Sequence, residues 1–230
     1  VASSREEARE AMAQPGALSS SSRPPGVALL FPGQGPLLAG AGLDLYRFPV
    51  FAGALDACSV ALAPWIGRPL IELLADRHAL SRTRWAQPAF VAVQLALMRL
   101  WESWGLVPTA WLGHSLGELS AACAAGACDI QEAVVFAAER GRLMEGCAGG
   151  AMLAIDAPVS AVREVLGTAC VIAALNAPES VVVAGTEQGV RDVEDRLDLL
   201  GTASRRVAVD RAFHSPAMEP IVDGVREAAA

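Results

Sequence analysis

The residues with the clearest chemical potential are a serine and its flanking glycines in the segment 113–117, Gly-His-Ser-Leu-Gly. An apolar run at 109–112 precedes this segment, and an alanine-rich stretch that begins at Glu118 follows it. This order predicts a strand, a tight turn and a helix, in which the glycines permit a strained backbone and close approach of strand to helix. A serine in such a turn can act as a nucleophile, and an ordinary strand-to-helix turn is the alternative interpretation.

A serine hydroxyl becomes a useful nucleophile when a base lies beside it, and the chain has three histidines. His114 is adjacent to Ser115, and consecutive side chains in a tight turn point in different directions. His78 lies in a polar stretch typical of a solvated helix end. His214 follows the strand-like run 206–209 and precedes a predicted helix. Because α/β enzymes carry catalytic groups at strand-to-helix junctions, we predict that Ser115 and His214 form the catalytic pair.

Composition excludes several classes of protein. The length of 230 residues allows a full hydrophobic core, and the net charge of −7, with scattered basic residues, argues against a nucleic-acid partner. Charged residues interrupt the apolar stretches before a span of about 20 residues is reached, so we expect no membrane-spanning segment. The five cysteines include no C-x-x-C pair, which indicates reduced thiols in a cytoplasmic protein. No cluster of residues implies a metal or an organic cofactor.

The expected elements change character along the chain. A strand at 27–31 ends in a loop with two glycines at 32–35, and helices dominate from there to residue 147. The next segments are predicted as strand, helix, strand, strand, helix and strand, at 151–155, 159–166, 170–175, 180–184, 189–200 and 204–209. This order predicts a ferredoxin-like unit inserted between Ser115 and His214, with the site in the cleft between the two parts.

Several short segments, in a fixed order, give the sequence a resemblance to a known family. They are Phe-Pro-Gly-Gln-Gly at 31–35, Gly-His-Ser-Leu-Gly-Glu at 113–118, Glu-Arg-Gly at 139–141, Gly-Ala-Met at 150–152, Asn-Ala-Pro at 176–178 and Ala-Phe-His-Ser-Pro at 212–216. From about Val27 onward, the chain resembles the acyltransferase domains of polyketide synthases and the malonyl-CoA:acyl-carrier-protein transacylases. The resemblance implies an α/β fold, in which an α/β-hydrolase-like large subdomain with a parallel sheet and a nucleophile elbow holds an inserted ferredoxin-like small subdomain.

The resemblance also implies a domain organisation. Residues 1–25 resemble the tail of the linker between a ketosynthase and an acyltransferase, in keeping with their charged and Ser/Pro-rich composition. We expect the large subdomain over 26–147, the small subdomain over 148–210 and a return to the large subdomain over 211–230. Because the last residues read as an unfinished helix and family members continue further, we expect this last part to be incomplete and the chain to be C-terminally truncated.

Roles for individual residues follow from the resemblance. Ser115 would take the acyl group as an ester, and His214 would activate first this serine and then the acceptor thiol. The backbone N–H groups of Gln34 and Leu116 would form the oxyanion hole. Arg140 would bind the free carboxylate of the acyl group through a bidentate pair, although without the resemblance it reads as a surface arginine of a helix.

The acyl group that the resemblance implies is malonyl. Leu116 after the nucleophile and Phe213 before the histidine match the malonyl-type pattern, in which Phe213 would fill the space that a 2-methyl group needs. Arg211 and the pair 36–37 depart from that pattern. The implied reaction is ping-pong transfer from malonyl-CoA, or a related acyl-CoA, to the phosphopantetheine thiol of an acyl carrier protein, in the cytoplasm and beside a neighbouring ketosynthase domain.

Two other functions fit parts of the sequence. In a serine hydrolase, water would replace the carrier thiol and Asp210 would complete a triad with Ser115 and His214. That interpretation leaves Arg140 and the inserted subdomain without a role. A catalytically inert domain that docks a carrier protein is the second alternative, which the intact serine, histidine and arginine disfavour.

Overall fold

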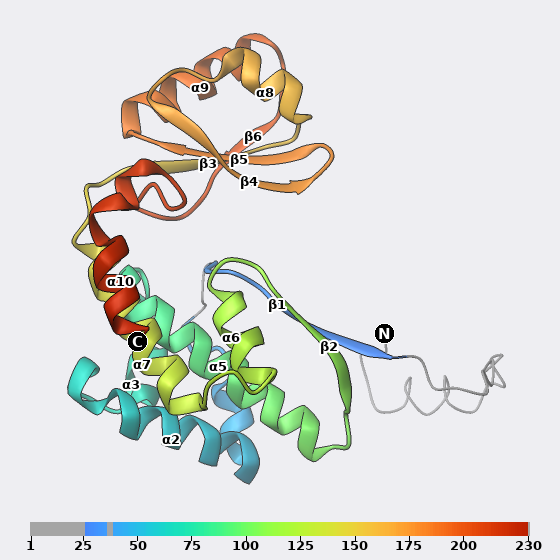
Figure 1. Cartoon of the computed structure of the whole chain (residues 1–230), viewed down its shortest axis with the longest axis vertical. Coiled ribbons are helices and arrows are strands. Elements are labelled where there is room, and N and C mark those ends of the chain that lie inside the picture. The colour runs from blue at the N-terminus through green and yellow to red at the C-terminus, as the bar shows by residue number, and fades with distance from the viewer. Residues whose placement is uncertain (1–25, 36–38, 230) are drawn as a thin grey trace, which may run out of the picture.

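The computed structural model describes residues 26–35 and 39–229. The predicted linker over 1–25 and the pair 36–37 lie outside the described residues. Figure 1 shows two bodies: a mainly helical body with a short sheet, and a four-stranded sheet covered by two helices. The chain passes from the first body to the second and then returns to the first.

The larger body carries a short parallel sheet among its helices. Strands β1 (Val27–Phe31) and β2 (Pro108–Gly113) pair in parallel, with Phe31 opposite Gly113. Both strands end at the same edge, so the loop after β1 and the turn after β2 lie side by side. The helices of this body are η1 (Leu43–Arg47), α2 (Pro49–Ile66), α3 (Leu70–Ala75), α4 (Arg77–Leu80), α5 (Thr83–Ser103), α6 (Gly117–Ala124) and α7 (Ile130–Glu145).

Helix α5 is the centre of the core of this body, and α2 and α7 pack against it. Most residues of α5 are buried, and the buried residues of α2 recur at helical spacing: Phe51, Leu55, Cys58, Leu62 and Ile66. Helix α7 begins at a capping box, in which Asp129 and Glu132 each accept a hydrogen bond from the other's backbone N–H. This helix lies in the stretch to residue 147 that is predicted to be mainly helical.

One helix is long and apolar enough to span a membrane, although we expected no such segment from the sequence. Helix α2 has 18 residues with a mean hydropathy of 1.4, which by length and composition is enough to cross a bilayer. Its only charged residue is Asp56, which accepts a hydrogen bond from Tyr46 at 2.7 Å. In the structure 28% of this helix is buried, and its buried residues form a stripe that packs on α5. Core helices of soluble proteins pass the same test of length and composition.

The smaller body has the strand order predicted for a ferredoxin-like unit. Its elements are β3 (Ala151–Ile155), α8 (Val159–Val165), β4 (Cys170–Ala177), β5 (Ser180–Gly185), α9 (Glu187–Leu199) and β6 (Ser204–Arg206). The strands form one antiparallel sheet in the order β4-β5-β3-β6. Alternation along β3 sends Leu153 and Ile155 into the core shared with α8 and α9, and sends Met152 to the opposite face. That open face is turned toward the helical body (Figure 1).

The helices and strands of the small sheet end within two residues of their predicted bounds, apart from its last strand, and the segment after Ser215 also differs from its prediction. The last strand was expected to run to residue 209, but β6 ends at Arg206, because the N–H of Val209 donates to the carbonyl of Val207 in a tight turn that leads the chain out of the sheet. The helix predicted to follow His214 is first a 3-10 helix, η2 (Pro216–Ile221), and then an α-helix, α10 (Val222–Ala228). Pro220 inside η2 has no N–H to donate to an α-helical hydrogen bond.

The two connections between the bodies run side by side. Gly149 and Arg211 form an antiparallel bridge, and the N–H of Gly150 donates to the carbonyl of Asp210 at 3.2 Å. The chain therefore returns beside the place where it left, which brings the loop of His214 back to the helical body.

We expect Gly117→Ala to destabilise the fold by about 3 kcal/mol, because overpacking against backbone that cannot move is costly. A Cβ at Gly117 would overlap the carbonyl group of Phe31 and lie 2.6 Å from its carbon. Gly53→Ala is the control, since a Cβ there meets open space within helix α2 and alanine is the better helix former. Denaturant midpoints measure both changes, and a Gly117→Ala variant as stable as the parent would contradict this account.

Candidate active site

Ser115 lies at a strained turn between β2 and α6. Its φ is 52°, and within the described part of the chain the only other non-glycine residue with positive φ is His214, at 58°. Such backbone costs free energy and is concentrated at functional sites. A Cβ at Gly113 would overlap the backbone of Glu118, so the turn can be this tight only with glycine there. The predicted strand, elbow and helix are confirmed.

The structure brings Ser115 and His214 together although 99 residues separate them. Ser115 Oγ lies 2.8 Å from His214 Nε2, which is hydrogen-bond distance. His78 lies exposed on α4, and His114 lies beside Ser115 with its ring against Gly33. Of the three histidines, His214 is therefore the one placed to accept the serine proton.

The surroundings of His214 favour the neutral imidazole that a base requires. Burial lowers the pKa of His214, the positive charge of Arg140 lowers it further, His114 adds to this effect, and the negative charge of Glu118 opposes it. A pKa below the ordinary value of 6.5 leaves the ring unprotonated over a wider range of pH.

An NMR titration of His214 is expected to give a midpoint below 6.5, and Arg140→Ala is expected to raise that midpoint, because a positive neighbour is removed. Since the folded pKa is depressed, the unfolded state binds more protons in this range. The contribution of His214 to stability is therefore complete above pH 6.5 and falls as the pH drops through the folded pKa. A midpoint above 6.5 in the parent protein would contradict the burial argument.

The two residues predicted to supply oxyanion donors line one cavity with Ser115. Gln34 lies in the loop after β1, and Leu116 is the N-cap of α6, where the N–H groups of Gly117 and Glu118 donate to the carbonyls of His114 and Ser115. A Cβ at Gly33 would lie 2.9 Å from both Nδ1 and the carbonyl oxygen of His114, so glycine lets this loop approach the elbow. The arrangement brings backbone donors near the serine hydroxyl.

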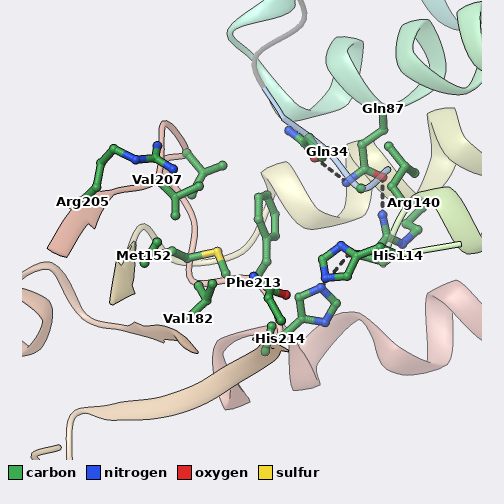
Figure 2. Close-up of a pocket in the computed structure, with 17 residues that line it drawn as sticks. Gln34, Gln87, His114, Arg140, Met152, Val182, Arg205, Val207, Phe213 and His214 are labelled. Carbon is green, nitrogen blue, oxygen red and sulfur yellow. Dashed lines mark hydrogen bonds between the residues drawn. The ribbon is translucent and has the colours of Figure 1, made fainter. Parts of the chain in front are cut away.

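Arg140 projects from α7 into the same cavity, where it is half-buried (Figure 2). Its Nη1 donates to Gln87 Oε1 at 2.7 Å, and burial lowers the pKa of the guanidinium while the negative charge of Glu118 opposes that shift. The interpretation as a surface arginine is wrong for this position, because Arg140 is half-buried and lines the cavity. Its neighbour Glu139 pairs with Arg142 instead. Within the described residues, no carboxylate forms an ion pair with Arg140.

The cavity has a volume of about 230 Å³ and two chemically different ends. Ser115, His214 and Arg140 lie at the polar end, on elements of the larger body and on the returning loop. The apolar end comes from the open face of the small sheet and from the segment that leads to His214 (Figure 2). Its apolar residues are Met152, Ala154, Ala174, Val182, Val207, Val209 and Phe213, and two polar residues of the small sheet, Asn176 and the exposed Arg205, also line the cavity. An acyl group with a charged terminus fits such a division.

Sequence reasoning missed Gln87, which joins two predicted site residues. Gln87 is 1% exposed, and its Nε2 donates to Gln34 Oε1 at 3.2 Å while its Oε1 accepts from Arg140. The signal available in the sequence was an uncharged polar residue near the start of a long apolar helix, next to Pro88.

The triad of the hydrolase alternative is not assembled. The Asp210 carboxylate pairs with Arg211 at 2.9 Å, and the Asp210 side chain is 61% exposed. Arg211 also donates to the carbonyl of Glu145 at the end of α7, which anchors the loop before His214. Within the described residues, His214 hydrogen-bonds to Ser115 and to no carboxylate.

Comparisons with known proteins agree with this geometry. A family model described as the acyl transferase domain matches residues 28–230. The chain is 44% identical over 198 residues to the mycoketide-CoA synthase of Mycobacterium tuberculosis, which covers 84% of this chain and 5% of that protein. It is 42% identical over 203 residues to the polyketide synthase GfsB of Streptomyces halstedii, which covers 85% of this chain and 4% of that protein. The chain thus spans a small part of the curated relatives that it matches.

Solved structures give the same result. The acyl transferase domain of SpnD, solved with a 2-(pent-4-yn-1-yl)malonyl group, superposes with a TM-score of 0.89 at 36% identity, over 99% of this chain and 56% of that one. MCAT from Streptococcus pneumoniae superposes with a TM-score of 0.78 at 33% identity, over 88% of this chain and 69% of that one. The predicted α/β-hydrolase-like fold with a ferredoxin-like subdomain is confirmed. The chain belongs to the acyl transferase domain family of polyketide synthases and related transacylases.

Proposed function

We propose that this domain transfers a malonyl unit from malonyl-CoA, through an ester on Ser115, to the phosphopantetheine thiol of an acyl carrier protein in polyketide biosynthesis. The observation that carries this proposal is the meeting of a serine–histidine pair and a half-buried arginine in one cavity. A nucleophile alone would suit many acyl groups. The guanidinium of Arg140 adds a preference for a group that ends in a carboxylate.

Acylation of the enzyme is the first half of the reaction. His214 Nε2 accepts the proton of Ser115 Oγ as this oxygen attacks the thioester carbonyl, and the same proton then passes to the sulfur of the departing CoA. The backbone N–H groups of Gln34 and Leu116 stabilise the negative charge on the former carbonyl oxygen, at roughly 3 kcal/mol per donor. The product is a malonyl ester on Ser115.

The second half passes the malonyl group to the carrier. His214, neutral again after CoA has left, takes the proton of the phosphopantetheine thiol, and the thiolate attacks the ester of Ser115. The serine oxygen leaves with the proton from His214, which restores the free enzyme. Side chains and backbone groups of the domain perform these steps, and the CoA donor and the carrier supply the acyl group and the thiol.

The ester must persist until the carrier arrives. A site that binds a terminal carboxylate disfavours ordinary acyl chains, because these would leave the desolvated guanidinium of Arg140 without a partner.

We place this reaction in the cytoplasm, beside a ketosynthase domain of a synthase. The division into 26–147, 148–210 and 211–230 remains our prediction for how the chain is organised.

Intact-protein mass spectrometry tests the proposal. The protein is incubated briefly with malonyl-CoA, methylmalonyl-CoA and acetyl-CoA in competition, and the acyl adduct is identified by its mass and mapped to a residue. We expect a malonyl adduct on Ser115 that a carrier protein with a free phosphopantetheine thiol removes. An adduct that water removes as fast as the carrier does would favour a hydrolase, and stable carrier binding without any adduct would favour an inert docking domain.

Phe213 is expected to limit the choice of acyl group. Its side chain is 8% exposed and lines the apolar end of the cavity with Met152 and Val182. Phe213→Ser opens space for a 2-methyl group, so we expect the ratio of methylmalonyl to malonyl adduct to rise about tenfold, since one methyl contributes roughly 1–3 kcal/mol. Phe213→Leu, which keeps most of the apolar bulk, is the control. Unchanged selectivity in the serine variant would place the gate elsewhere.

A further inference from the structure

Gln87 is one of few buried polar side chains in the described part of the chain. It lies on α5, and the buried residues around it on that helix are mainly apolar. A buried side-chain amide is costly unless its donor and its acceptor are both satisfied. Here both are satisfied, and two of the partners are residues of the candidate site.

The amide of Gln87 makes three polar contacts. Its Oε1 accepts from Arg140 Nη1 at 2.7 Å, and its Nε2 donates to Gln34 Oε1 at 3.2 Å (Figure 2). The same Nε2 donates to Met144 Sδ at 3.2 Å. One side chain therefore joins the guanidinium to the loop whose backbone we assign to the oxyanion hole. The distance to Arg140 is short, as is typical of a hydrogen bond with a charged donor.

We propose that Gln87 is a positioning residue, whose neutral amide fixes the guanidinium of Arg140 while leaving its positive charge available for the carboxylate of the acyl group. This inference rests on the proposed function and adds to it a cause of its selectivity. A carboxylate at position 87 could hold the guanidinium equally well, but it would form a buried ion pair and neutralise the charge that the substrate must meet. A glutamine oxygen supplies the direction of the hydrogen bond without the opposite charge.

The electrostatics around Arg140 agree with this role. Within the described residues, the guanidinium has a hydrogen bond to an amide and no ion pair, and burial lowers its pKa. Glu118 acts on it through the field of its charge, with no hydrogen bond to it among the described residues. A desolvated cation held by a neutral acceptor is a binding site for an anion.

A second glutamine of the same helix provides a matched control. Gln94 lies two turns further along α5, where its Nε2 donates to the carbonyl of Pro32 at 2.8 Å and its Oε1 accepts from Ser120 Oγ at 2.5 Å. Gln94 thus also holds the loop after β1, but it makes no hydrogen bond to Arg140. A change at Gln94 affects the loop after β1 and not the guanidinium of Arg140, whereas a change at Gln87 affects both. Comparing the two changes therefore isolates the effect on Arg140.

The test compares Gln87→Glu, Gln87→Met and Gln94→Met in two measurements. The first is the ratio of malonyl to acetyl adduct formed from an equal mixture of malonyl-CoA and acetyl-CoA. We expect Gln87→Glu to lower this ratio about tenfold or more, because a hydrogen-bonded ion pair competes with the substrate for Arg140. Gln87→Met is expected to lower it less, and Gln94→Met is expected to slow both donors equally and leave the ratio unchanged.

The second measurement is the rise in unfolding temperature that sodium malonate produces over sodium chloride at equal ionic strength. The parent and Gln94→Met are expected to show this rise, and Gln87→Glu is expected to lose it. Gln87→Glu also removes the N–H donor to Gln34 and Met144, so some loss of stability is expected in any case. A purely structural role would leave both the adduct ratio and the rise with malonate unchanged in Gln87→Glu, which would overturn the inference.

The two measurements also separate this inference from the proposed function. If the parent forms no acyl adduct with any donor, the proposed function fails, and loss of malonate protection in Gln87→Glu still supports the role of Gln87 toward Arg140. If the parent forms the malonyl adduct and Gln87→Glu keeps both the adduct ratio and the malonate protection, the proposed function stands and the inference is wrong. If Gln87→Glu does not fold, the ratio of malonyl to acetyl adduct is compared between Gln87→Met and Gln94→Met. A lower ratio in Gln87→Met alone supports the inference, and equal ratios in the two variants contradict it.

Discussion

Ser115→Ala is expected to form no acyl adduct with any CoA donor, a loss of about 10⁴-fold or more in the rate of acylation. The attacking oxygen is removed, and no other hydroxyl is recorded in hydrogen-bond contact with His214 within the described residues. The fold is expected to persist, because alanine occupies less space than serine and the strained turn depends on the glycines at 113 and 117. Mass spectrometry of the acylated protein measures the first effect and denaturant unfolding the second.

An exposed serine far from the cavity is the control for this change. Ser160 lies on α8, on the side of the small sheet away from the helical body, and Ser160→Ala is expected to leave both adduct and stability unchanged. A malonyl adduct on Ser115→Ala of the same yield as on the parent would show that another residue is the nucleophile. The assignment of His214 as its base would then fail as well.

Arg140→Ala is expected to lower acylation by malonyl-CoA about a hundredfold and to raise the share of acetyl adduct in competition. Truncating one partner of a desolvated charge pair costs about 2–5 kcal/mol of binding free energy. An acetyl group has no carboxylate to pair with Arg140, so its transfer does not lose this free energy. The amide of Gln87 would lose the partner of its Oε1, so a smaller loss of stability is expected too. The competition experiment with three CoA donors reports the selectivity directly.

The same helix offers a matched arginine. Arg142 is exposed and pairs with Glu139, so Arg142→Ala removes an equal charge from α7 without touching the cavity. A surface ion pair of this kind contributes about 0–1 kcal/mol, and selectivity for malonyl-CoA is expected to stay at the parental level. Unchanged preference for malonyl-CoA in Arg140→Ala would remove the carboxylate-binding role, and with it the reason for the neutral amide at Gln87.

Local patterns predicted most of the elements. Strands β1 and β3 have the predicted bounds, and the elbow, the helix that starts at Ile130 and the βαββαβ order follow from glycines, caps and alternation that lie within a few residues of one another. These signals act over short distances along the chain, so sequence alone contains them. Ser115 could be predicted for the same reason, because the strain of its turn depends on its immediate neighbours.

Other predictions failed where a distant contact or a single backbone hydrogen bond decides where an element ends or which type of helix forms. The strand β6 ends three residues early because a tight turn begins at Val207, and the helix at Pro216 is first a 3-10 helix. We also expected charged residues to interrupt every apolar stretch, but the segment of α2 contains only one, Asp56. For β6 and for the helix after His214, the outcome depends on which hydrogen bonds the folded chain leaves available.

The sequence by itself determined the class of fold, the order of the elements and the residue types of the site. The tertiary structure alone decided which of these residues meet: His214 with Ser115, Asp210 with Arg211 instead of with the histidine, and Gln87 with Arg140. The physical reason is that periodicity and turn chemistry are properties of neighbouring residues. A hydrogen bond between α5 and α7, or across the two connections to the small sheet, exists only after packing has set the distance between elements far apart in the chain.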